Sequence, residues 1–332
     1  MGLNYDPGFS LTESGTDVTS KLAPYLSTLT LTDNAGTESD RLVLTLISDT
    51  LPTPLEGAVL RLGLGFGSSM VDKGQFIVDE VSVSGPPRVI SITASAAPMD
   101  SRKQGGLLQS QKTRSWDAQT IGSMVSDMAG AHGLAARVSD SLSSISIEHL
   151  DQVNESDMSV LTRLAQRFGA VAKPAGGFLM FVKEGEGKSA SGRELMQVDL
   201  MPYQVSTYQF RFASRGKIGS VVASYTDSET GKPTSLQMGD GDPVFNIVYP
   251  YPNKQEAEKA AEARFNRVRS DADSVQLVLP ATAEIMPLVA EGKMSLSSFG
   301  DREDGLWRVK SLIWSLSGAG LQLSASGDRL GS

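Results

Sequence analysis

The chain has 332 residues but no cysteine, and its only histidines are His132 and His149. The lack of cysteine excludes disulfide bonds, thiolate metal sites and cysteine nucleophiles. With two histidines, most zinc sites and most catalytic triads that need an imidazole are excluded as well. A chain of this length can still form two or three domains, each with a core large enough to fold without cross-links.

Positive charge and long apolar runs are also scarce. The chain carries 38 acidic residues against 30 lysines and arginines, which gives a net charge of -8 and a pI near 5.0. A protein that grips nucleic acid would present a basic face, so the acidic balance argues against that class. No stretch of about eighteen apolar residues occurs, and we therefore expect no membrane-spanning helix and no membrane insertion.

An internal repeat is the most informative feature that the chain does contain. Gly57–Ala96 and Gly292–Ser326 both alternate apolar and polar residues between glycine-containing turns. Such alternation is typical of antiparallel strands that bury one face. The matched apolar positions are Phe76 with Trp307 and Val78 with Val309. The sequence therefore predicts a mainly β fold that contains two copies of one antiparallel β-barrel.

A segment of different character, residues 107–200, lies between the two β units. Its first predicted helix begins within Thr113–Asp117 and ends at Gly130 or Gly133, because glycine readily adopts the left-handed conformation that follows many helices. The apolar residues at helical spacing in it are Ile121, Met124, Val125 and Met128. A polar stretch, Asp100–Gly106, marks the boundary before this segment.

A second helix is predicted in the same segment. Asn154–Asp157 offers residues that cap helix N-termini, and Gly169 ends the apolar pattern. The apolar stripe consists of Met158, Leu161, Leu164, Ala165 and Phe168. Strands are expected around Ile145 and Ile147 and at Phe178–Val182. These elements predict a small α/β insert between the barrels.

The last region contains a Gly-, Asp- and Pro-rich loop, Thr226–Pro252, followed by a charged helix, residues 254–269. A narrow apolar seam on this helix favours packing against the second barrel. The predicted domains are a first barrel at 1–106, the α/β middle domain at 107–200, and a second barrel with its laid-on helix at 201–332.

Two acidic or glycine-rich motifs have simple structural explanations. Gly63–Gly67 superficially suggests a nucleotide loop, but no helix follows it and it lies within a strand pattern, so we predict a glycine-rich bend. Asp79 and Glu80 are neighbours on a strand, and their side chains point to opposite faces unless the strand bulges. We therefore predict no acid/base pair there.

The remaining polar candidates are also interpreted as structural. His149 follows a strand alternation, which predicts an inward or edge histidine with a hydrogen-bond partner. His132 lies at a helix end, where it would favour the helix dipole as a cap. Asp301–Asp304 and Asp240–Pro243 lack the ligand spacing of a calcium loop and are expected to be solvated turns. We assign no catalytic, cofactor-binding or metal-binding residue, and the sequence identifies no interface residues.

Two tryptophans of the second repeat lie an odd number of positions apart. Because side chains on a strand alternate between faces, Trp307 and Trp314 are expected to point to opposite faces, one into the core. An exposed tryptophan on the other face would be a candidate anchor for a protein interface.

Three segments, taken in order, resemble a known family. Gly74–Pro87 is similar to the signature of the phage late control D family, the baseplate hub of contractile tails, which is related to the hub portion of type VI secretion spike proteins. Ser115–Asp117 with Ala131–Leu134 resembles the middle domain of that family, as does Asp151–Asp157 with the segment Leu161–Ala170. Together these segments span most of the chain.

The resemblance implies a homotrimer in which each chain contributes two tube-type β-barrels. Six barrels would let a threefold ring meet a sixfold tail tube on one side and a threefold central spike on the other. The implied partners are the tube, the spike and the baseplate wedge proteins, and DNA would pass through the lumen without specific binding. The implied role is a symmetry adaptor and conduit without cofactor or enzymatic activity. The expected location is the baseplate of a virion or tail-like particle assembled in the bacterial cytoplasm.

Other function classes stay open at this point. A carbohydrate- or peptidoglycan-binding or -degrading module would need paired carboxylates at a suitable separation, and the sequence suggests no such pair. A free-standing binding module is a further alternative. If the resemblance to the late control D family holds, both an infectious phage and a headless, pyocin-like particle are compatible with the sequence.

Overall fold

The computed structural model describes residues 6–36, 38–96, 110–175, 178–185, 187, 194–213, 218–227, 230–270 and 273–330. The chain divides into two compact units. The first comprises Met1–Arg102, Glu194–Gln209 and Gln276–Gly327, and the second comprises Lys103–Arg193, Phe210–Val275 and Asp328–Ser332. Within the described residues, no helix is long and apolar enough to cross a membrane.

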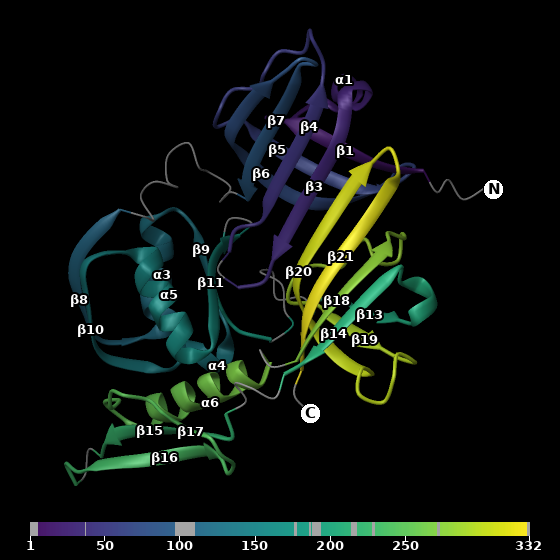
Figure 1. The fold of residues 1–332 in the computed structure, drawn as a ribbon. Coiled ribbons are helices and arrows are strands. Elements are labelled where there is room, and N and C mark those ends of the chain that lie inside the picture. The colour runs from purple at the N-terminus through teal and green to yellow at the C-terminus, as the bar shows by residue number, and fades with distance from the viewer. Residues whose placement is uncertain are drawn as a thin grey trace. The chain divides into compact units, whose positions relative to one another are not determined.

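One large, mostly antiparallel sheet dominates the first unit (Figure 1). Over the described residues its strand order is β14-β18-β21-β20-β3-β4-β7-β6-β5-β1-β2, and β19 connects β13 to β20. The strands are β1 (Pro7–Glu13), β2 (Thr16–Asp17), β3 (Leu26–Asn34), β4 (Arg41–Ile47), β5 (Val59–Phe66), β6 (Ser69–Ser84), β7 (Val89–Ala96), β13 (Gln197–Leu200), β14 (Thr207–Phe212), β18 (Asp273–Pro280), β19 (Lys293–Leu296), β20 (Gly305–Ser317) and β21 (Gly320–Arg329). The short helices are α1 (Thr19–Leu22), η1 (Ala23–Tyr25) and η2 (Pro202–Gln204).

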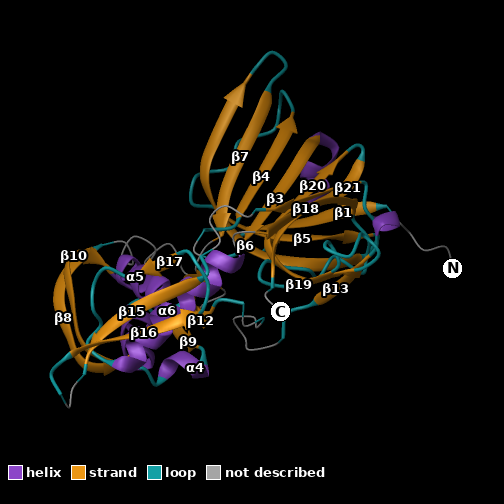
Figure 2. Cartoon of the chain, turned by 60° about the horizontal axis from the view of Figure 1, so that its bottom comes forward, coloured by secondary structure: helices purple, strands orange, loops and turns teal. Residues whose placement is uncertain are grey.

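Strands of both repeats belong to this sheet, which confirms the mainly β prediction. The first repeat forms β5, β6 and β7, and the second forms β19, β20 and β21. Strands β3 and β4 connect the two sets, because β20 pairs with β3, β3 with β4 and β4 with β7 (Figure 2). In the first of these pairings Trp314 lies opposite Leu31. The alternating apolar residues face the core as expected, and Phe76, Val78, Trp307 and Val309 are all buried.

The predicted orientation of the two tryptophans is wrong, because both Trp307 and Trp314 are fully buried. The alternation along β20 slips by one residue between Val309 and Leu312. The slip coincides with a change of partner, since residues 305–308 pair with β19 and residues 311–317 pair with β3. Both halves of the strand therefore point their large apolar side chains into the core. Neither tryptophan is available as an anchor on the surface.

The second unit contains the predicted α/β domain. Its β8 pairs with β10 in a two-stranded sheet, and β12 lies between β11 and β9 in another. Helices α3 and α5 share a single core with both sheets. The elements are β8 (Gln111–Thr120), α3 (Ile121–Ala131), β9 (Ala135–Val138), α4 (Asp140–Ser143), β10 (Ser146–Ser156), α5 (Asp157–Phe168), β11 (Ala170–Ala175) and β12 (Phe178–Lys183).

Both predicted helices exist, but the first begins later than expected. Thr113–Asp117 belongs to β8, because it pairs along its length with β10. The helix begins after Thr120, whose Oγ1 accepts a hydrogen bond from the backbone N–H of Ser123. The predicted domain boundary at Asp100–Gly106 lies outside the described residues.

The second unit also contains a smaller group of elements that differs from prediction. The expected loop Thr226–Pro252 includes two strands, and these pair with β15 on either side. The following helix packs against β15 and α5, because its buried Ala257 and Ala261 share a core with Val221 and Ala223 of β15. It therefore differs from the predicted helix laid on the second barrel. These elements are β15 (Ser220–Thr226), β16 (Pro233–Gly239), β17 (Val244–Asn246) and α6 (Lys254–Ser270).

Replacement of Trp314 by alanine tests whether β20 buries both of its tryptophans. We expect Trp314→Ala to lower the free energy of unfolding by about 3–5 kcal/mol, since it leaves a large cavity in a close-packed core. Ile313→Ala on the same strand is the matched control, because Ile313 is 38% exposed, and we expect a loss of about 1 kcal/mol or less. Urea unfolding measures both values, and equal losses would contradict the observed phase of β20.

Candidate functional site

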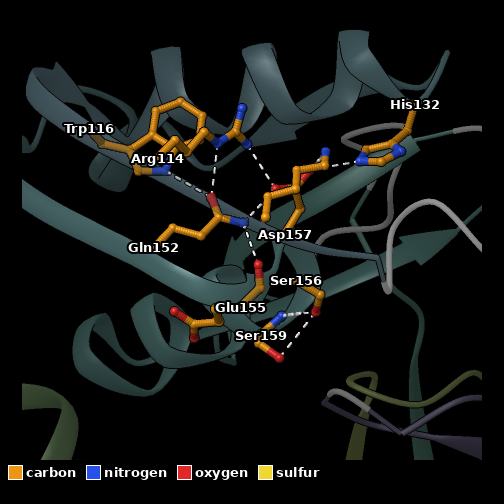
Figure 3. Close-up of polar contacts among 9 residues, drawn as sticks. Arg114, Trp116, His132, Gln152, Glu155, Ser156, Asp157 and Ser159 are labelled. Carbon is orange, nitrogen blue, oxygen red and sulfur yellow. Dashed lines mark hydrogen bonds and ion pairs between the residues drawn. The ribbon is translucent and has the colours of Figure 1, made fainter.

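A group of buried and partly buried polar side chains lies in the α/β domain around Asp157 (Figure 3). Its members, called here the Asp157 cluster, are Lys112, Arg114, His132, Gln152 and Asp157. The side chains of Asp157 and Gln152 are completely inaccessible to solvent, and His132 is 2% exposed. Buried polar groups are costly unless they are hydrogen-bonded, so the contacts of this cluster are the first question.

Four elements bring the cluster together. Antiparallel pairing places Arg114 of β8 directly opposite Gln152 of β10. The chain then passes from β10 into α5 through Ser156, whose Oγ accepts the backbone N–H of Ser159 at 3.1 Å as an N-cap. Asp157 is thus the first residue of α5, where the helix dipole favours an anion. His132 follows the last residue of α3.

Each carboxylate oxygen of Asp157 has two donors. Oδ2 lies 2.6 Å from Lys112 Nζ and 2.7 Å from His132 Nε2. Oδ1 lies 2.8 Å from Arg114 Nη2 and accepts a 2.9 Å hydrogen bond from Gln152 Nε2. Charge-assisted contacts of this kind are stronger than neutral hydrogen bonds.

Gln152 connects the carboxylate of Asp157 to side chains of β8. Its Oε1 accepts hydrogen bonds from Arg114 Nε at 2.9 Å and Trp116 Nε1 at 3.2 Å. The Arg114 guanidinium also lies 3.9 Å from the centre of the Trp116 ring, a distance typical of a cation–π contact. Arg114 is therefore fixed on three sides, and the cluster extends as one network from β8 to α3.

The charge state of Asp157 follows from two opposing effects. Burial raises the pKa of its carboxyl group, but hydrogen bonds from Lys112, Gln152 and His132 and the charge of Arg114 outweigh burial and lower the pKa to about 2. Asp157 is ionised at neutral pH, and its lone pairs are occupied by fixed donors. Such a carboxylate stabilises structure and has no free position from which to take a proton from a substrate.

The two histidines have different environments. His132 stands at the predicted helix end, but its imidazole is turned inward to Asp157, so capping alone is an incorrect description. His149 is exposed on β10, with Nδ1 2.5 Å from Asp117 and Nε2 3.2 Å from Asp151. Hydrogen bonds to Asp117 and Asp151 raise the pKa of His149. It is thus a strand histidine with hydrogen-bond partners, as expected.

The acidic and glycine-rich motifs form local structure. Gly63–Gly67 lies in β5 and the turn after it, and a Cβ on Gly65 would lie 1.9 Å from the Ser69 carbonyl oxygen, so the close backbone approach requires glycine. Asp79 and Glu80 are both exposed at a register shift in β6, and Asp79 accepts a hydrogen bond from Ser95 Oγ. Strand β6 therefore contains a bulge at these residues, and the two neighbouring side chains do not point to opposite faces as they would in a regular strand.

The predicted acidic turn has a defined role in its own loop. Asp304 accepts hydrogen bonds from the backbone N–H groups of Ser298, Phe299 and Gly300 at 2.9, 2.8 and 3.3 Å. The loop Asp240–Pro243 connects β16 to β17. Across the part of the chain that the structure describes, no three His, Asp or Glu side chains are grouped so that they could hold a metal ion.

Comparisons with known proteins agree on one family. The model of the phage tail baseplate hub (GPD) family matches residues 105–317. The probable baseplate hub protein of Escherichia phage P2 is 30% identical over 97% of this chain and 93% of its own length. That of Escherichia phage 186 is 40% identical over 71% of this chain, but the match spans only 60% of the phage 186 protein. A 43 kDa tail protein of prophage MuSo2 from Shewanella oneidensis has the same fold, with a TM-score of 0.72, 14% identity and coverage of 97% and 98% of the two chains.

Acid titration tests the role of Asp157. Because the pKa of Asp157 in the folded chain lies below its ordinary value, its contribution is present above about pH 4 and is lost as the pH falls toward 2. We expect Asp157→Asn to lower the free energy of unfolding by about 3–5 kcal/mol at pH 7, since Lys112 and Arg114 lose their counter-charge. This difference should shrink by about 2 kcal/mol between pH 5 and pH 2.

The matched control for this titration is Asp127→Asn, since Asp127 is an exposed carboxylate on α3 of the same domain. We expect it to change stability by less than about 0.5 kcal/mol at either pH. Urea unfolding monitored at pH 7, 5, 3 and 2 gives all values. A difference for Asp157→Asn that does not vary with pH would contradict the assigned charge state.

Proposed function

The chain belongs to the phage tail baseplate hub (GPD) family, and on that basis we propose that three copies form a ring that adapts the sixfold tail tube to a threefold central spike. The observation that carries this proposal is the match to the phage P2 hub over almost the whole of both chains. As a family member, the chain is a structural component of the baseplate of a phage tail or tail-like particle.

The internal repeat supports the change of symmetry. Three chains with two similar β units each provide six units around one axis, which is the number that a sixfold tube requires. Both units are joined in one sheet through β3 and β20, so their relative register is fixed within a chain. We propose that each unit is a tube-type barrel and that the six barrels line the conduit.

We propose the tail tube, the central spike and the baseplate wedge proteins as partners. The role needs rigid surfaces rather than chemistry, which agrees with the fully engaged carboxylate of Asp157 in the Asp157 cluster. We propose accordingly that the chain is not an enzyme. The net charge of -8 would discourage specific contact with DNA that passes through the lumen.

Solution mass tests the proposed ring. When the protein is mixed with the spike protein from the same gene cluster, light scattering should give a complex that contains three chains of 35.3 kDa in addition to the mass of the spike measured alone. Alone, the chain can be monomeric or trimeric under the proposal, because the spike supplies the threefold template. The spike alone and the hub with an unrelated trimeric protein are the controls. A hub that stays monomeric with its own spike would refute the ring.

A further inference from the structure

The second unit contains two hydrophobic cores rather than one. The core of the α/β domain includes the apolar faces of α3 and α5. Residues 218–270, called here the α6 module, enclose a separate core between α6 and the sheet of β15, β16 and β17. Because each part buries its own apolar side chains, separating them would leave both cores intact.

Helices α5 and α6 form the joint between the two parts. At its centre Gly169, the left-handed residue that ends α5, lies against Ala263, and a Cβ on Gly169 would be 2.9 Å from the Ala263 Cβ. Small residues bring the helices close but bury little apolar area. A second contact, between Lys183 and Glu262 at 3.0 Å, is partly exposed and is expected to contribute little.

One ion pair in the joint joins a buried carboxylate to a partly buried guanidinium. Arg167 of α5 donates to the carboxylate of Glu256 on α6, whose side chain is 1% exposed. The Arg167 guanidinium also lies 4.7 Å from the centre of the Tyr251 ring. Asn253 precedes α6, and its amide exchanges hydrogen bonds with the backbone and side chain of Glu256. Glu256 is therefore fixed in position, and Arg167 is its cationic partner from α5.

The negative charge of Glu256 is not fully compensated by its surroundings, because the pKa of its carboxyl group stays above the ordinary value. Burial raises the pKa of its carboxyl group, the charge of Arg167 and a hydrogen bond from Asn253 lower it, and the charge of Glu148 on β10 raises it, with a net increase. Arg167 Nε has no hydrogen-bond partner within the described part of the chain. Desolvation of a buried pair can exceed the attraction between its charges, so the joint is only weakly favoured by this contact.

We propose that the α6 module can undock from α5 as a body, and that the charge balance between Arg167 and Glu256 is the latch: the paired charges permit docking, and the loss of one charge releases the module. Without Arg167 the carboxylate of Glu256 would be buried with no counter-charge, and undocking would return it to water. With both charges removed, the close contact of Gly169 with Ala263 would hold the joint again. The position of the module on α5 is thereby controlled by charge.

Because the natural chain lacks cysteine, a pair of spin labels reports the docking state directly. We place them at Asp127→Cys on α3 and Ser235→Cys on β16, both exposed positions, and measure the distance by double electron–electron resonance. The parent chain should give one narrow distance. Arg167→Met should increase the undocked population at least tenfold at pH 7. Arg167→Met combined with Glu256→Gln should restore the narrow distance.

The matched control is Arg163→Met, one turn earlier on α5, since Arg163 binds Glu155 within the α/β domain and should leave docking unchanged. Hydrogen exchange of the β15 and β16 amides follows the fold of the module in every variant. Three results would overturn the latch: an unchanged distance in Arg167→Met, a double variant that stays undocked, or loss of amide protection in β15 whenever the distance lengthens.

Discussion

The pairing of β3 with β20 is the contact on which the first unit depends. It connects strands that lie almost three hundred residues apart in the chain, and it joins two repeats that would otherwise be separate sheets. The contact is possible because β20 is long enough to serve two partners in succession. The one-residue slip within β20 lets both halves of the strand keep their apolar side chains in the core, including two tryptophans. A single strand thus connects the strands of the first repeat to those of the second within one sheet.

The α/β domain depends instead on a buried charge. Asp157 accepts contacts from two strands and a helix end, so removing any one partner leaves polar atoms unpaired in the interior. Such networks are weak evidence for high stability, because replacing a buried ion pair by apolar residues of similar volume often leaves the stability unchanged or raises it. They do fix geometry, since Asp157 of α5 contacts side chains of β8 and β10 and the residue at the end of α3 through one carboxylate. The adaptor role proposed above would require fixed geometry of this kind more than it would require high stability.

Patterns local in sequence were predicted well, and contacts between distant residues were not. Period-two alternation identified both repeats, and helical spacing identified the cores of α3 and α5. The phase slip in β20 escaped prediction because it arises from a change of partner strand. The stretch Thr113–Asp117 was assigned to a helix because its polar residues are compatible with a helix start, whereas pairing with β10 decides its conformation. His132 was recognised at its helix end, but its pairing with Asp157, 25 residues away, has no local signal. The position of α6 likewise depends on the core that it shares with β15.

The bulge in β6 determines which residues of the segment Gly74–Pro87 face the neighbouring strand β7. Phe76 and Val78 stand opposite Ala96 and Ala94, and after the bulge Val81 and Val83 stand opposite Ile92 and Ile90. If the same sequence paired without a bulge, Glu80 and Ser82 would stand opposite those isoleucines. Asp79 is therefore the residue that the bulge leaves out of the ladder, and without it Val81 and Val83 would still stand opposite Ile92 and Ile90. The bulge accommodates one additional exposed carboxylate in β6 without moving the valines that follow to the other face of the sheet.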